Sequence, residues 1–151
     1  MNNWQSLLVM GVGLLNFGAF ASGYYISRYK KNPIGNTFFL YPFGIFVWGD
    51  AIVFGIFWFL ASAVTLFLND WILFLLIYSV FWLVRSVGET IYWFNQQFSE
   101  VKRMPKESVS FYKYLKIEDE YAVWFIAQIF NQSITVISTI TTVYLFHLWL
   151  K

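Results

Sequence analysis

Charged residues in this chain occur in groups, and the stretches between the groups are long and apolar. Four such stretches lie at about residues 6–27, 43–68, 71–94 and 121–150. A bilayer core about 30 Å thick is crossed by about 20 residues of helix, so each stretch is long enough to span it. Their apolar residues run continuously rather than in alternation, which favours helices over barrel strands. The pattern predicts an all-α integral membrane protein, an antiparallel four-helix transmembrane bundle formed as one domain by residues 1–151.

The overall composition supports a lipid environment. Of the 151 residues, 59% are hydrophobic and 12% are charged, whereas charged residues make up about 25% of a typical soluble domain. A net charge of +2 is too small for an electrostatic nucleic-acid binder, so we expect no nucleic-acid partner. The chain has no cysteine and one histidine, which excludes disulfides, thiolate zinc sites and iron–sulfur clusters. We expect no cofactor and no metal.

The connections between the four stretches differ in charge, and this difference predicts an orientation. The loops at 28–42 and 95–120 hold eight of the ten basic residues. Because short loops rich in Lys and Arg stay on the cytoplasmic side, both loops are expected there and both termini outside. Only Asn69 and Asp70 separate the second stretch from the third, so these two helices are expected to form a tight hairpin.

Five polar residues from three of the stretches fall at similar depths below the cytoplasmic ends. A rise of 1.5 Å per residue places them about 7–15 Å deep. They are Asp50, Arg85, Glu89, Gln128 and Asn131. Each charge at the bilayer centre costs about 2.5–3.5 kcal/mol on the insertion scale, so the charged members are expected to have partners.

Arg85 and Glu89 are spaced i, i+4 and so face the same way on a helix, where they can form an ion pair. Asp50 can take the second edge of the guanidinium, because arginine presents a planar fork to carboxylates. This cluster has two interpretations. It is either a structural ion-pair network or a site for a proton, a small cation or a substrate, since ionisable groups inside membranes are commonly functional.

A stripe of polar residues runs along the fourth stretch at spacings of three and four. It contains Gln128, Asn131, Thr135, Ser138 and Thr142. In lipid, such residues favour either hydrogen bonds between helices or a wet cavity. The first stretch has two pairs of small residues, Gly18/Ser22 and Ala19/Gly23, which permit close approach of a second helix.

These features lead to three hypotheses for function. The first is a structural or interaction subunit, with the bilayer, a second copy or another membrane subunit as its partner. The second is a small proton- or cation-coupled transporter in which Glu89 or Asp50 titrates. The third, an intramembrane lipid-modifying enzyme using those acids, has the least support, and no catalytic residues are predicted, because the sole histidine, His147, lies at the opposite end of its stretch.

Overall fold

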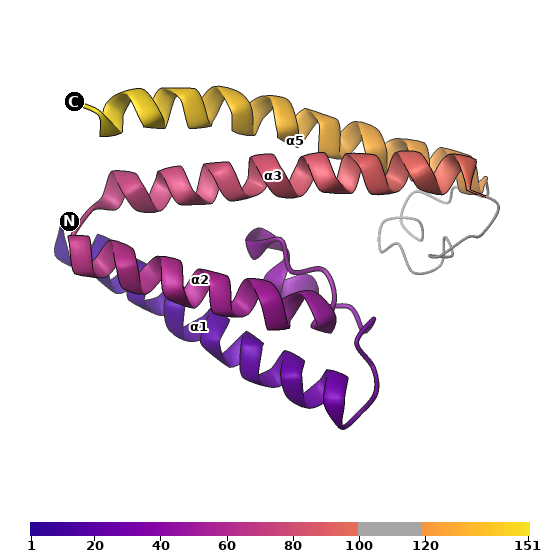
Figure 1. Cartoon of the computed structure of the whole chain (residues 1–151), viewed down its shortest axis with the longest axis horizontal. Coiled ribbons are helices and arrows are strands. Elements are labelled where there is room, and N and C mark those ends of the chain that lie inside the picture. Colours follow the sequence, from indigo (N-terminus) through magenta and orange to yellow (C-terminus); the bar gives the residue numbers. More distant parts are fainter. Residues whose placement is uncertain (100–118) are drawn as a thin grey trace. The chain divides into compact units, whose positions relative to one another are not determined.

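The computed structural model describes residues 1–99 and 119–151 and contains four long helices (Figure 1). They are α1 (Asn3–Arg28), α2 (Trp48–Leu68), α3 (Trp71–Phe98) and α5 (Glu120–Trp149), with a six-residue 3-10 helix, η1 (Phe38–Phe43), between α1 and α2. Each long helix is long and apolar enough to cross a membrane. The helical class and the number of long apolar helices are therefore as predicted, and most of the basic loop expected at 95–120 lies outside the described residues.

The start of the second helix differs from the prediction. The sequence pattern places it at Phe43, but α2 begins at Trp48, after an extended residue at Val47. The backbone turns instead at Gly44, whose φ of 67° ends η1 in the left-handed region that glycine adopts without strain. Asp50 consequently lies in the first turn of α2, not seven residues into a longer helix.

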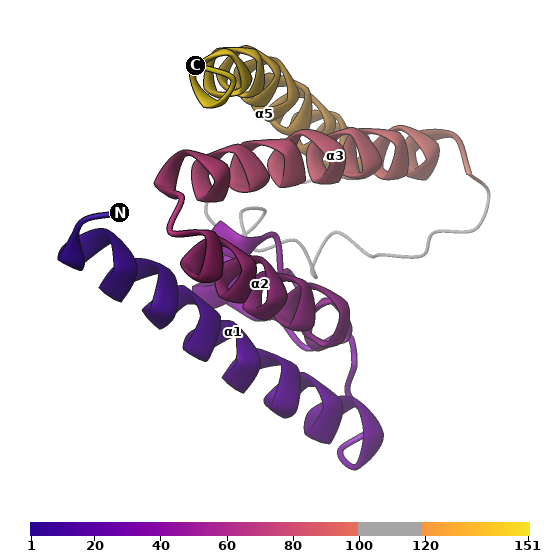
Figure 2. The same ribbon diagram turned by 60° about the vertical axis from the view of Figure 1, so that its left-hand side comes forward.

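The chain divides into two compact units, and the first contains Met1–Tyr78 with Leu148–Lys151. Within it, α1 and α2 pack closely through small residues (Figure 2). A methyl group added at Gly23 would lie 2.8 Å from the Ala51 Cβ, and one at Gly13 would lie 3.0 Å from the Ser62 Cβ. Residues with higher numbers in α1 contact residues with lower numbers in α2, so these two helices run in opposite directions.

Only one of the two small-residue pairs on α1 lies at this contact. Ala19 and Gly23 are buried, whereas Gly18 and Ser22 are exposed, and a methyl group at Gly18 would meet nothing within 4 Å. The expectation that Gly18 and Ser22 permit close approach to another helix is not met by the packing of α1 on α2. The buried positions follow the helical repeat that passes through Gly13, Asn16 and Ala19.

A tight turn joins α2 to α3, as the sequence predicts. Asn69 ends α2 in the left-handed conformation, with φ of 53°. Asp70 then caps α3, because its Oδ1 accepts a hydrogen bond of 3.0 Å from the backbone N–H of Leu73. Its Oδ2 accepts a second bond, of 2.9 Å, from Nε1 of Trp149.

The second compact unit contains residues 79–147, which include most of α3 and of α5. Its hydrophobic core is a small cluster near one end of the pair, formed by Trp93, Val123, Trp124 and Ala127. The buried residues of α5 lie on one narrow side, and most of its large apolar residues are exposed. Hydrogen bonds between polar residues also join these two helices.

Candidate functional site

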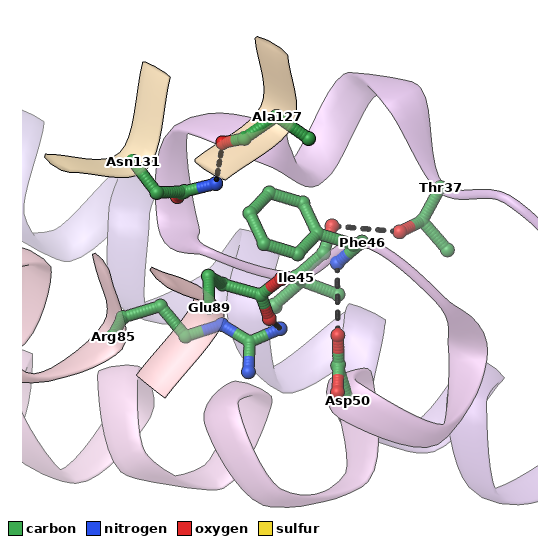
Figure 3. A network of polar contacts seen from close by, with 8 residues as sticks. All are labelled: Thr37, Ile45, Phe46, Asp50, Arg85, Glu89, Ala127 and Asn131. Atoms are coloured by element: carbon green, nitrogen blue, oxygen red, sulfur yellow. Dashed lines mark hydrogen bonds and ion pairs between the residues drawn. The ribbon is translucent and has the colours of Figure 1, made fainter. Parts of the chain in front are cut away.

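The candidate site in the second unit begins with an ion pair on α3. Nη2 of Arg85 lies 3.1 Å from Oε1 of Glu89, one helical turn further along (Figure 3). The two side chains are 18% and 14% exposed, so both are partly covered and neither is fully buried, whereas the predicted buried cluster would require full burial. Arg85 is near the middle of the 28-residue helix. The i, i+4 spacing thus brings the two groups together as the sequence predicts.

Asp50 lies in the other compact unit, where its carboxylate has a structural task. Its Oδ2 accepts a hydrogen bond of 3.1 Å from the backbone N–H of Phe46 (Figure 3). An aspartate in the first turn of α2 is also favourably placed for the positive end of the helix dipole. A cluster that joins Asp50 to Arg85 and Glu89 stays a prediction.

The polar stripe of α5 meets hydroxyl groups of α3. Thr135 Oγ1 donates to Ser86 Oγ over 2.8 Å. Ser79 Oγ lies 2.8 Å from Thr142 Oγ1 and also donates to the Ser138 carbonyl oxygen at 3.1 Å. These contacts pair early positions of α3 with late positions of α5, so the two helices run in opposite directions.

The same stripe continues towards the other end of α5 with amide side chains. Gln128 Oε1 accepts a hydrogen bond of 2.7 Å from Nε2 of Gln97 on α3. Asn131 is buried, and its Nδ2 donates to the Ala127 carbonyl oxygen one turn earlier in the same helix, at 2.9 Å (Figure 3). Four of the five stripe residues therefore make hydrogen bonds to α3, and Asn131 lies between them on the covered side.

Three polar residues of this contact were not identified from the sequence: Ser79, Ser86 and Gln97. Their positions are seven and eleven residues apart, which places them on one side of a helix. This spacing could predict a polar side of α3 that faces another helix. The charges of Arg85 and Glu89 in the same stretch are more conspicuous and hide that pattern.

The contacts described above are neutral hydrogen bonds between α3 and α5 and the ion pair of Arg85 with Glu89. In the described ranges, 1–99 and 119–151, no three His, Asp or Glu side chains lie close enough together to hold a metal ion. Comparison with protein-family models, with curated proteins and with solved structures finds no match to this chain.

Proposed function

We propose that the protein is a multi-pass integral membrane protein with a structural or interaction role, built as an antiparallel bundle of its four long helices. The observation that carries this proposal is that polar side chains of α3 and α5 form hydrogen bonds with each other. Ser86 and Thr135 bond to each other, and so do Gln97 and Gln128. Side chains that satisfy one another in this way hold helices together in lipid.

Insertion in a membrane is supported by what the helices expose. Large apolar side chains cover their outer sides, among them Leu14 at 63%, Phe67 at 89% and Ile140 at 66% exposed. Contiguous apolar surface of this kind is rare on soluble monomers but is the expected boundary with acyl chains. Both termini are proposed to lie outside and the basic residues of both loops on the cytoplasmic side, following the distribution of Lys and Arg.

Aromatic residues at one end of the first unit are consistent with a position at the membrane surface. The rings of Trp4 and Trp71 lie 5.4 Å apart, edge to face, and Trp149 donates to Asp70. Tryptophan is enriched at the boundary between lipid and water because its ring is apolar and its N–H is polar. This end is proposed to be the outer surface.

The partner that an interaction role implies is a second copy of the chain or another membrane subunit, in addition to the surrounding lipid. The alternative function is transport of a proton or a small cation. The ion pair between Arg85 and Glu89, at 3.1 Å in the middle of an apolar helix, is the observation that favours this alternative, since a charged pair at that depth is costly unless it is used.

A flux measurement separates the two functions. The wild-type protein and Glu89→Gln are reconstituted in liposomes, and proton and Na⁺ or K⁺ entry is recorded with fluorescent indicators under an imposed gradient. The structural role predicts the same background flux as protein-free liposomes for both. A flux in the wild type that Glu89→Gln abolishes would contradict the structural role and establish transport. Unfolding measured in detergent shows that each preparation is folded.

A further inference from the structure

The chain between α1 and α2 folds back on itself as a closed hairpin of residues 33–49. Its two arms are joined at the base by an isolated bridge between Asn36 and Val47. The N–H of Gly49 donates to the Pro33 carbonyl oxygen over 2.8 Å, and that of Trp48 donates to Gly35 over 3.1 Å. The first and last residues of the hairpin therefore lie side by side, and η1 lies at the opposite end, the tip.

The tip of this hairpin lies beside the helices rather than beyond their ends (Figure 1). Nε1 of Trp58 donates to the Phe43 carbonyl oxygen over 3.0 Å. Trp58 is at the centre of the 21-residue α2, about 15 Å from the first residue of that helix. Leu40, which is 0% exposed, packs in a core cluster with Ala19 of α1, about 14 Å inward from Arg28.

Side chains bond to three backbone groups of the hairpin. Thr37 Oγ1 donates to the Ile45 carbonyl oxygen over 2.8 Å, and Asp50 accepts from the N–H of Phe46 (Figure 3). The Pro42 carbonyl oxygen accepts a hydrogen bond of 2.8 Å from the hydroxyl of Tyr78. Inside lipid, non-helical backbone is tolerated only where it is buried in protein or lines a water-filled cavity. The buried bond of Thr37 and the 0% exposure of Leu40 and Ile45 meet this condition on the inner side of the hairpin.

The outer surface of the hairpin is apolar, and the chain next to its base is basic. Ile34, Phe38 and Phe39 are 70%, 74% and 65% exposed. Immediately before them come Arg28, Lys30 and Lys31, and no acidic residue precedes Asp50 in the chain. Exposed phenylalanines suit acyl chains, and basic residues at the edge suit the anionic headgroups of the cytoplasmic leaflet.

We propose that residues 33–49 form a re-entrant membrane segment, which enters the lipid from the side of the basic residues, turns at η1 and returns to the same side. The partner of its exposed surface is the acyl-chain layer of that leaflet, which contacts Phe38 and Phe39. This inference rests on the proposed membrane insertion of the four helices and adds to it a fifth, non-spanning element.

Because the chain has no cysteine, single cysteines can report the depth of each position. Three variants carry a nitroxide in vesicles of phosphatidylcholine and phosphatidylglycerol: Phe39→Cys at the tip, Lys30→Cys before the base, and Val53→Cys, which is 61% exposed on α2. Power saturation then compares contact of the label with oxygen, which concentrates in lipid, and with a water-soluble nickel chelate. All three positions have exposed side chains, so labelling is not expected to disturb packing.

The re-entrant segment predicts that the ratio of oxygen to nickel accessibility at position 39 is several-fold higher than at position 30 and close to that at position 53. A ratio at position 39 equal to that at position 30, with position 53 still in lipid, would overturn the re-entrant segment and leave the four spans intact. Water-like ratios at all three positions would instead overturn the proposed membrane insertion itself.

Discussion

Replacing Gly55 with alanine is expected to lower the free energy of unfolding by about 1–3 kcal/mol, the usual cost of adding a methyl group to a closely packed contact. A Cβ at Gly55 would lie 2.8 Å from the carbonyl oxygen of Asn16 and 2.8 Å from the backbone nitrogen of Phe20. Because both atoms belong to the main chain of α1, no side-chain rotation relieves the contact, and the two helices must move apart. Reversible unfolding in mixed detergent and SDS micelles measures the loss.

Gly18→Ala is the matched control for this substitution. Gly18 is also in a helix of the same unit, but a methyl group there meets no atom within 4 Å. Alanine favours a helix over glycine by up to about 1 kcal/mol, so stability should be unchanged or slightly higher. Equal effects of the two substitutions would contradict the close packing of α1 on α2.

Arg85→Leu is expected to lower the free energy of unfolding by up to about 3 kcal/mol, because the partly buried ion pair lies between an exposed pair and a fully buried one, whose loss costs at least that much. The side chains of Arg85 and Glu89 retain 18% and 14% exposure. The loss is expected mainly because the partly covered Glu89 side chain loses its ion pair with the guanidinium group. Lys151→Leu, at the exposed end of the chain, should have little effect under the same conditions.

Combining Arg85→Leu with Glu89→Gln should restore much of the lost stability, because the second substitution replaces the carboxylate that loses its ion pair by a neutral amide. Adding Asp50→Asn tests whether Asp50 belongs to the same cluster, since asparagine still offers an oxygen to the N–H of Phe46. Further recovery would support the three-residue cluster predicted from the sequence. No recovery in either combination would mean that Arg85 stabilises the protein by some means other than charge compensation.

The four long helices were predictable because a span of hydrocarbon demands a long apolar stretch, and charge groups separate such stretches clearly. The start of α2 was not predictable in this way. Residues 43–47 are as apolar as the helix that follows, so hydropathy cannot separate a buried loop from a helix. Only Pro42 and Gly44 indicate a break, and the two side chains that bind the Pro42 and Phe43 carbonyl oxygens come from α2 and α3, far along the sequence.

In the candidate site, contacts within one helix could be predicted from the sequence, whereas contacts between helices could not. Spacing along one helix was enough to predict the ion pair of Arg85 and Glu89 and the common side of the α5 stripe. The partners of that stripe depend on how α3 and α5 align, and neither helix alone specifies this alignment. Hydropathy predicts Asp50 too far into its helix for a related reason, because it extends that helix through the break at Gly44.

The claim that polar residues between α3 and α5 hold the protein together is tested most directly by a double-mutant cycle on Ser86 and Thr135. Ser86→Ala, Thr135→Val and the double variant are unfolded in mixed micelles, with Ser133→Ala as a control, because the hydroxyl of Ser133 is exposed and donates to Ile129 within α5. The two substitutions are expected to show a coupling energy of about 0.6 kcal/mol, with an upper limit near 1.7, and the control is expected to have no effect. Strictly additive effects of the two single substitutions would contradict the claim.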